Sequence, residues 1–272
     1  MSAALATLIN GEPQELLSVQ DRGLQYGDGL FETLSCVDGR PRWLERHLER
    51  LALGCERLGI AAPDERLLRS ELHSLLKGRP RAIAKVICTR GVATARGYRP
   101  SGDESPTRIV SVYEWGAARI EQFRLGLSQV PLACNPRLAG IKHLNRLEQV
   151  LAQRDAAAGN WHEVAMCTGT GEVICGSMSN LFVVRRGDWL TSPLGQCGVA
   201  GIMRSLVLEL ASRRDITVRI APISTRELDE ATSLFVTNVR WGVQPVHSYQ
   251  GRALKVDERG VRLQESIDAT VA

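Results

Sequence analysis

Turn sequences that separate two short strand-like runs recur along this chain of 272 residues. The pairs Asn10–Gly11 and Asp38–Gly39 favour tight turns, because these residue types adopt left-handed backbone conformations at little cost. Thr168–Gly171 and Arg185–Asp188 separate two further pairs of runs in the second half of the chain. The pattern therefore predicts β-hairpins in both halves.

Strands and helices are predicted to alternate between these turns. Strands are predicted over residues 7–9, 30–37, 82–89, 108–113, 125–129, 163–167, 173–175, 181–184, 189–191, 217–220 and 233–237. Helices are predicted over residues 43–58, 64–76, 145–158 and 201–212. In the first helix the apolar residues recur every three or four positions, which is helical spacing, at Leu44, Leu48, Leu51, Cys55 and Leu58.

The third predicted helix begins with the pattern of a capping box. Asn145 takes the cap position, and Glu148 follows it by three residues. Gly159–Asn160 is expected to close the same helix. The segment 138–142 before it is predicted to be extended, so Lys142 would lie at a junction between strand and helix.

This mixture of elements indicates an α/β or α+β protein with two domains. We place the boundary at 118, which gives an N-terminal α/β domain over 1–118 and a C-terminal domain over 119–272. The stretch 21–29 holds three glycines within seven residues and is predicted to interrupt any helix or strand. The polar loop 90–106 is long enough to indicate a functional segment.

The composition excludes several classes of protein. The 34 basic and 30 acidic residues give a formal net charge of only +4 and are well mixed, so no nucleic-acid partner is expected. No apolar run reaches the roughly 18 residues that a membrane span needs, and the start lacks the basic segment of a signal peptide. The seven cysteines are scattered without C-x-x-C spacing. We therefore expect a cytoplasmic protein with reduced thiols and no bound metal.

Lys142 is the first candidate for chemistry. The sequence lacks a P-loop, a dinucleotide-binding fingerprint, H-E-x-x-H and G-x-S-x-G. Only four residues are lysine, and this one lies at the predicted junction. A lysine held on a rigid element beside a pocket can act as a Schiff-base nucleophile. Most lysines are solvated surface residues, however, and composition alone favours that interpretation.

Three further segments could bind a phosphate group. Gly201–Arg204 opens a predicted helix, and helix N-termini bind phosphate through their amides. Arg50 lies on the polar side of the helix over 43–58 and could pair with a phosphate through two hydrogen bonds. Thr237–Val239 ends a predicted buried strand, where backbone amides become available. Each signal alone is weak, because most helix starts and most arginines bind no ligand.

Together these motifs resemble the class IV pyridoxal-phosphate enzymes. The matching segments follow one another in order along nearly the whole chain: Asp21–Thr33, Arg46–Leu51, Ser179–Phe182, Gly201–Arg204 and Phe235–Pro245. Two further segments resemble the aminodeoxychorismate lyases of that family in particular: Arg96–Tyr98 and the run Asn135–Leu151 around Lys142. The resemblance implies fold type IV, with a smaller N-terminal and a larger C-terminal α/β domain. It also implies a homodimer with pyridoxal 5′-phosphate as cofactor.

The resemblance also implies roles for particular side chains. Lys142 would bind the cofactor as the Schiff-base lysine and would later act as the general base. The cofactor's phosphate would be held by Arg50 and by backbone amides at Ile202, Met203, Asn238 and Val239. The substrate would be contacted by Arg96, Tyr26 and Asn145.

The implied reaction is the elimination of pyruvate from 4-amino-4-deoxychorismate, which leaves 4-aminobenzoate, a folate precursor. The substrate carries two carboxylates, so cationic anchors are expected, and Arg90, Arg96 and Arg99 in the polar loop are candidates. The nearest alternative is an aminotransferase of the same fold that acts on branched-chain or D-amino acids. A non-catalytic binder of small molecules or nucleic acid is the alternative from another class.

One position departs from the family pattern. The family usually places a glutamate five residues before the asparagine of its Asn-Leu-Phe motif, where it bonds the pyridine nitrogen of the cofactor. This position is Cys175 here, and Glu172, three residues earlier, would face the other side of a strand. A thiol holds a proton on that nitrogen less well than a carboxylate does. Because aromatisation drives the elimination, we expect the weaker partner to suffice for lyase activity and to limit transamination.

Overall fold

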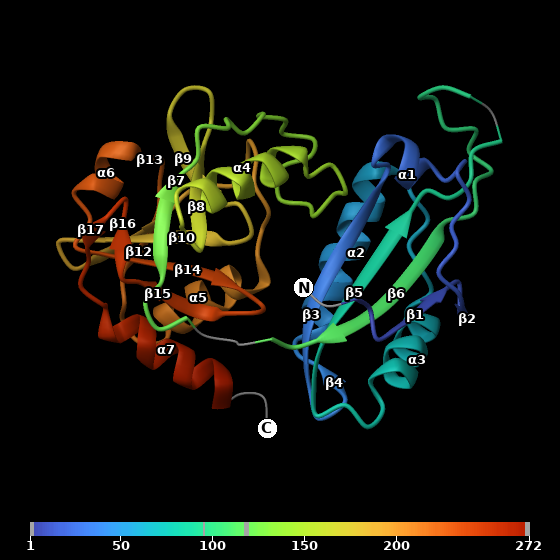
Figure 1. The fold of residues 1–272 in the computed structure, drawn as a ribbon, viewed down its shortest axis with the longest axis horizontal. Coiled ribbons are helices and arrows are strands. Elements are labelled where there is room, and N and C mark those ends of the chain that lie inside the picture. Colours follow the sequence, from blue (N-terminus) through green and yellow to red (C-terminus); the bar gives the residue numbers. More distant parts are fainter. Residues whose placement is uncertain (1–2, 95, 117–119, 270–272) are drawn as a thin grey trace. The chain divides into compact units, whose positions relative to one another are not determined.

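The computed structural model describes residues 3–94, 96–116 and 120–269 (Figure 1). It divides into two compact units, one comprising Met1–Ala117 with Ile141–Asn145 and the other comprising Ala118–Gly140 with Arg146–Ala272. Each unit mixes strands and helices, as the sequence predicts. The predicted domain boundary at 118 lies outside the described residues.

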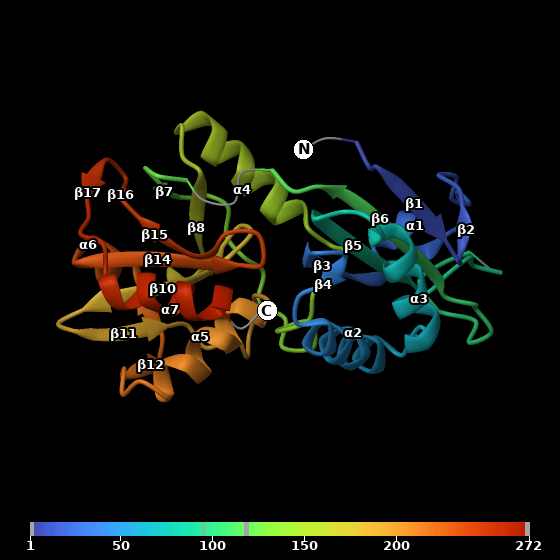
Figure 2. The same cartoon turned by 90° about the horizontal axis from the view of Figure 1, so that it is seen from below.

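The first unit is a six-stranded antiparallel sheet in the order β2-β1-β6-β5-β3-β4. Its strands are β1 (Ala6–Ile9), β2 (Glu12–Pro13), β3 (Gly29–Val37), β4 (Arg40–Pro41), β5 (Arg81–Thr89) and β6 (Thr107–Glu114). Helices α2 (Leu44–Leu58) and α3 (Glu65–Leu76) cover one face of this sheet (Figure 2). Leu48 and Leu51 of α2 and Leu68 and Leu72 of α3 are buried there, because the helical spacing of three and four places them on one side.

The glycine-rich stretch contains a short helix, so the prediction that it would interrupt any helix is wrong. Helix α1 covers Arg22–Tyr26. The Asp21 side chain accepts a hydrogen bond from the Gly23 N–H at 2.8 Å and caps its start. Gly27 ends the helix with a positive φ of 65°. The glycines thus terminate the helix or lie where space is tight, as at Gly23, where a Cβ atom would lie 2.2 Å from Thr89.

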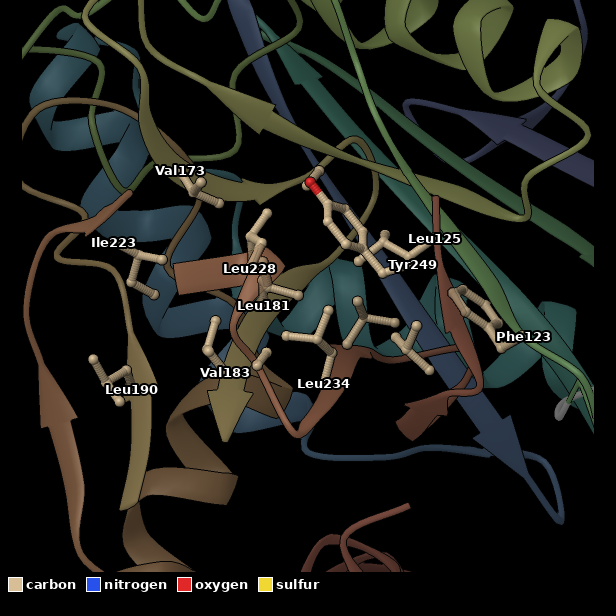
Figure 3. Packing of buried hydrophobic residues seen from close by; sticks show 14 of the residues in the cluster. Phe123, Leu125, Val173, Leu181, Val183, Leu190, Ile223, Leu228, Leu234 and Tyr249 are labelled. Carbon is tan, nitrogen blue, oxygen red and sulfur yellow. The ribbon is translucent and has the colours of Figure 1, made fainter. Parts of the chain in front are cut away.

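The second unit contains two sheets. The five-stranded sheet has the order β12-β11-β10-β14-β15, and the six-stranded sheet has the order β13-β9-β8-β7-β16-β17. The strands are β7 (Arg124–Leu127), β8 (Glu163–Cys167), β9 (Glu172–Gly176), β10 (Asn180–Arg185), β11 (Asp188–Thr191), β12 (Val218–Ile220), β13 (Ile223–Ser224), β14 (Ser233–Asn238), β15 (Gly242–Val246), β16 (Ser248–Tyr249) and β17 (Arg252–Ala253). The two sheets share a core of aliphatic and aromatic side chains (Figure 3).

Successive side chains along the strands alternate between that core and the opposite face of the five-stranded sheet. Leu181 of β10 and Leu234 of β14 point into the shared core, whereas their neighbours Phe182 and Phe235 stack on the opposite face with ring centroids 4.7 Å apart.

The helices of this unit are α4 (Leu147–Ala158), α5 (Ile202–Ser212), α6 (Thr225–Asp229) and α7 (Glu258–Ala269). Helices α5 and α7 pack on the five-stranded sheet, and α4 packs on β8. In the part of the chain that the structure describes, no helix is both long enough and apolar enough to cross a membrane.

The start of α4 differs from the predicted capping box. The helix begins at Leu147, and its cap residue Arg146 makes no side-chain capping bond. Asn145 instead donates a hydrogen bond from Nδ2 to the Gly27 carbonyl at 3.1 Å. Glu148 accepts a hydrogen bond from the Ala133 N–H at 2.9 Å. Both side chains are therefore used for long-range contacts, while the predicted end at Gly159–Asn160 is confirmed.

Candidate active site

Lys142 lies on a segment that pairs with the start of β3, on the edge whose other end pairs with β4. The Lys142 carbonyl accepts a hydrogen bond from the Phe31 N–H, and the Leu144 N–H donates to the Gly29 carbonyl, both at 2.9 Å. The other edge of β3 pairs along its whole length with β5. The predicted strand over 138–142 is not formed, since only isolated bridges occur, at Gly140 and His143.

The glycine-rich stretch makes room for this lysine segment. A Cβ atom on Gly27 would lie 2.6 Å from the Asn145 side chain, and one on Gly29 would lie 2.8 Å from Leu144. A Cβ atom on Gly29 would also lie 2.5 Å from the Cys88 carbonyl oxygen of β5, so side chains at these two positions would collide with the Asn145 and Leu144 side chains and with β5. Two of the glycines thus serve to seat Lys142, a role that their spacing in the sequence does not reveal.

The amine of Lys142 lies over an aromatic ring. Its Nζ atom is 4.3 Å from the centroid of the Phe31 ring, within cation–π distance. A second lysine, Lys85 of β5, approaches the same ring at 5.3 Å. Burial lowers the pKa of the Lys85 amine, so Lys85 is a second amine that a labelling experiment must distinguish from Lys142.

Arg50, the predicted phosphate ligand, is held by a buried carboxylate. Glu32 accepts hydrogen bonds from Arg50 Nε at 2.8 Å and from its Nη2 at 2.5 Å. Only 2% of Glu32 is exposed. Burial alone would raise the pKa of Glu32, but the Arg50 charge and the hydrogen bonds of His47 and Arg50 reverse this and lower it to about 2. The carboxylate is therefore ionised and fixes the orientation of the guanidinium.

His47 completes this cluster. Its Nδ1 atom lies 2.6 Å from Glu32 Oε2 and must be the donor, because an ionised carboxylate can only accept. Burial lowers the pKa of His47, and the charges of Arg50 and Lys142 lower it further against the pull of Glu32. His47 is therefore neutral near pH 7. Its Nε2 atom is buried and has no hydrogen-bond partner among the described residues.

The sequence prediction missed Glu32 and His47, although a signal was present. Glu32 shares the buried face of β3 with Leu30, Leu34 and Cys36, because strand side chains alternate between faces. A carboxylate in the middle of an apolar row requires a charged partner. His47 and Arg50 lie three residues apart on α2 and so face the same side.

Tyr26 is the last residue of helix α1 in the first unit. Arg96 lies in the long loop over residues 90–106 of the same unit. The Tyr26 ring packs edge-to-face against Tyr98, with centroids 5.4 Å apart. Arg22 is buried and donates to the carbonyls of Gly97 and Tyr98, which anchors the loop beside Tyr26. Arg96 is exposed on this loop.

Arg90, another candidate anchor in the loop, is occupied by structural contacts. It donates to both carboxylate oxygens of Asp28, at 2.7 and 3.1 Å, and to the carbonyls of Leu58 and Gly59. These bonds tie the start of the loop to the end of α2. The structure therefore gives Arg90 a scaffolding role and leaves Arg96 and Arg99 on the exposed part of the loop.

In the second unit, the N-terminus of α5 has the form of an anion site. Gly201 caps the helix, and Ile202 and Met203 supply amides of the first turn, which lack partners within the helix. A Cβ atom at Gly201 would lie 2.0 Å from Asn180 Oδ1. Asn180 also donates to the Val199 carbonyl at 2.9 Å and so fixes the turn before the helix.

The end of β14 lies beside this turn. Thr237 pairs with Asn180 across β14 and β10, and its buried Oγ1 atom has no hydrogen-bond partner in the described chain. Asn238 accepts bonds from the backbone N–H groups of Arg240 and Trp241, at 3.0 and 2.8 Å, and so orders the turn that contains Val239. Asn180 thus lies between the start of α5 and the end of β14, since it borders Gly201 and pairs with Thr237. That the amides of Ile202, Met203, Asn238 and Val239 bind a phosphate stays a prediction.

Cys175 of β9 is buried among apolar side chains of the same unit. Burial raises the pKa of its thiol to about 12, and the nearby Glu163 carboxyl adds to the increase. Glu163 is itself fully buried and accepts bonds from the N–H groups of Ser177 and Met178, at 3.1 and 3.0 Å, and from the Ser179 hydroxyl at 2.9 Å. Cys175 is therefore a neutral thiol near pH 7.

The chain is similar in sequence and in fold to known proteins. Residues 29–249 match the family model described as amino-transferase class IV. The aminodeoxychorismate lyase of Vibrio harveyi is 33% identical over 254 residues, covering 92% of this chain and 93% of that protein. The crystal structure of 4-amino-4-deoxychorismate lyase from Pseudomonas aeruginosa is 40% identical and superposes with a TM-score of 0.90, covering 97% of this chain and 99% of that one. A putative branched-chain-amino-acid aminotransferase of Methanocaldococcus jannaschii is 30% identical over 92% of this chain and 88% of that protein.

Proposed function

Because the chain belongs to the class IV aminotransferase family, whose cofactor is pyridoxal 5′-phosphate, we propose that it is a 4-amino-4-deoxychorismate lyase. The reaction would release pyruvate and leave 4-aminobenzoate. The observation that carries the proposal is that relatives named as this lyase, at 33% and 40% identity, resemble the chain more than the aminotransferase at 30% does.

The described residues suit the cofactor. Lys142 offers an amine on a rigid segment, which is the group that an aldehyde requires. The amides of Ile202 and Met203 and the unpartnered hydroxyl of Thr237 offer hydrogen-bond donors to a phosphate. In the first unit, Arg50, oriented by Glu32, offers the cation that the family resemblance assigns to a phosphate. Bound pyridoxal phosphate supplies an aldehyde that accepts amines and a conjugated ring that accepts electrons.

The residues of the first unit would perform the proton transfer. Lys142 would hold the cofactor through Nζ until the amine of the substrate replaces it. Its freed amine would then take the proton from the ring carbon of the substrate that carries the nitrogen. The Phe31 ring and the backbone bonds to β3 restrict where Nζ can go, which favours this short transfer.

Three side chains in or near the glycine-rich stretch and the long loop would bind the substrate. Arg96 would pair with one of its two carboxylates, because it lies exposed on the loop that Arg22 anchors. Tyr26 and Asn145 would line the same side of the first unit, since Asn145 bonds the carbonyl of Gly27, the residue after Tyr26. We further infer that the protein is a cytoplasmic homodimer, which light scattering and cell fractionation would test.

The neutral thiol at Cys175 would take the place next to the pyridine nitrogen that a glutamate usually holds. Its high pKa means that it cannot supply a negative charge to keep that nitrogen protonated. Loss of this charge weakens the electron sink. Aromatisation of the substrate would compensate in the elimination, whereas transamination has no such driving force.

The test is reduction of the holoenzyme with borohydride followed by peptide mapping. We expect the pyridoxyl group on Lys142 and none on Lys85, although both amines lie near the Phe31 ring. Lys142→Ala should abolish both the label and pyruvate release, and Lys85→Ala should preserve both. A label on any other lysine would disprove the proposed site.

The need for a keto-acid acceptor distinguishes the lyase from the alternative function, that of an aminotransferase. The lyase should release pyruvate from 4-amino-4-deoxychorismate steadily without any keto acid. An aminotransferase would stop after one turnover until a keto acid is added. A requirement for the keto acid would therefore overturn the lyase proposal.

A further inference from the structure

Two thiols of the second unit lie almost in contact. The sulfur atoms of Cys134 and Cys197 are 3.6 Å apart, although the residues are separated by 63 positions in the sequence. Cys134 is exposed to solvent, whereas Cys197 is only 6% exposed and packs in an apolar cluster. The pair therefore combines one thiol that solvent can reach with one that it cannot.

The backbone on both sides holds these sulfur atoms in place. The Gly140 N–H donates to the Gly198 carbonyl at 2.9 Å, and the Ala200 N–H donates to the Gly140 carbonyl at 3.0 Å. Leu132, two residues before Cys134, donates to the Cys167 carbonyl at 2.8 Å. The two cysteine segments are thus joined by hydrogen bonds beside the thiols, so the sulfur atoms meet without a rearrangement of the fold.

We propose that Cys134 and Cys197 form a peroxide-sensitive modification site that closes reversibly to a disulfide. The thiolate of Cys134 attacks one oxygen of a peroxide, which breaks the O–O bond and leaves a sulfenic acid and one water (or alcohol) molecule. The Cys197 sulfur then attacks the sulfenic sulfur and displaces a second water. The two thiols lose two electrons and two protons, and the peroxide is reduced.

Solvent access and acidity assign the two roles. Cys134 is the attacking thiol because peroxide can reach it. Burial and the hydrogen bond to Cys134 raise the pKa of Cys197 to about 12, so Cys197 acts only as the resolving thiol. Bond formation requires the sulfur atoms to close from 3.6 Å to about 2.05 Å. The Cys134 side chain is exposed, so rotation about its side-chain bonds has room to make this movement while the backbone stays bonded.

The first unit provides a matched control. Cys55 and Cys88 are also hydrogen-bonded to one another, and this bond and burial raise the pKa of Cys88. Both of these thiols are fully buried. If proximity alone were enough, this pair would oxidise as readily as Cys134 and Cys197. We expect it to stay reduced in the folded protein, because no peroxide reaches it.

The experiment treats the full-length protein with hydrogen peroxide, blocks the remaining thiols with iodoacetamide and maps peptides without reduction. We expect one intramolecular crosslink between Cys134 and Cys197, two fewer titratable thiols of the seven, and full recovery with dithiothreitol. The unfolding midpoint of the oxidised protein should rise by about 5 °C or more, since a long loop is closed.

Two serine variants test the assigned roles. In Cys197→Ser, Cys134 should accumulate as a sulfenic acid that dimedone traps. In Cys134→Ser, Cys197 should resist the same treatment, and the oxidised and reduced forms should melt at the same temperature. The proposal is overturned if wild-type Cys134 oxidises further while Cys197 keeps a free thiol, or if Cys55 and Cys88 crosslink first.

Discussion

Each unit of this protein buries a glutamate completely, yet the two carboxyl groups behave in opposite ways. Glu32 in the first unit is bonded by Arg50 and His47, and its pKa falls to about 2. Glu163 in the second unit is bonded by hydroxyl and N–H groups, and burial raises its pKa in spite of these bonds. Burial disfavours the charge in both cases. Only a full positive charge nearby reverses the effect, whereas neutral donors do not.

The largest expected loss of stability comes from removing the negative charge of Glu32, which pairs with Arg50. Glu32→Gln leaves a mostly buried guanidinium without its counterion, which should lower the free energy of unfolding by about 3–5 kcal/mol. Urea denaturation at pH 7 measures this loss, and circular dichroism checks that the variant folds. A loss under about 1 kcal/mol would show that the pair with Arg50 is not the source of the low pKa.

Glu163 should show the opposite dependence on pH. Its folded pKa lies above the ordinary value of 4.5, so its contribution to stability is full below pH 4.5 and is lost as the pH rises through the folded pKa. For Glu32 the contribution is full above pH 4.5 and is lost as the pH falls towards about 2, a change of about 3 kcal/mol.

Denaturation curves from about pH 2 to neutral pH measure this contrast, because Glu32 titrates between about 2 and 4.5 and Glu163 titrates above 4.5. The stability difference between wild type and Glu163→Gln should shrink as the pH rises, from about 1–3 kcal/mol in acid. The difference for Glu32→Gln should instead grow with pH. Parallel slopes for the two variants would refute the distinction between charged and neutral partners.

Cys175→Glu would add a carboxylate close to the buried Glu163. The new group would help to protonate the cofactor's nitrogen, so the ratio of side transaminase activity to lyase activity should rise by about tenfold, or about 1.4 kcal/mol. Single-turnover rates with an amino acid and with 4-amino-4-deoxychorismate measure this ratio. Equal changes in both rates would contradict the proposed role of the thiol.

The smallest loss of stability is expected at an arginine–glutamate pair that is exposed to solvent. Arg69 donates to both oxygens of Glu45, at 2.8 and 2.5 Å, in a geometry like that between Arg50 and Glu32. Glu45 is 69% exposed, however, and water screens the pair. Glu45→Gln should therefore cost less than about 1 kcal/mol. A cost equal to that of Glu32→Gln would mean that burial does not set the strength of these pairs.

Local periodicity predicts most of this fold, because each amphipathic element carries its own signal. The helix over residues 64–76 is confirmed as α3, and the strand over 163–167 is confirmed as β8. Helix α7 was missed although Leu263 and Ile267 lie four residues apart on its buried side, because Gly260 and many polar residues weaken the pattern.

The site is harder to predict, because its contacts join distant parts of the chain. Asn145 has the spacing of a helix cap, yet it bonds Gly27, 118 residues away. Glu32 binds its partners on α2 across 15 and 18 positions. The resemblance pointed to Lys142 and Arg50, but only the fold shows that Lys142 lies over Phe31 and that Arg50 is held by Glu32.

The segment Ile141–Asn145 belongs to the first unit although the chain on both sides of it belongs to the second. Severing the polypeptide near residue 118 would not give two self-sufficient fragments. The first would keep Arg50 but leave part of a β3 edge unpaired, and the second would carry Lys142 with no strand to orient it. Split halves would have to reassemble before the reactive amine regained its setting.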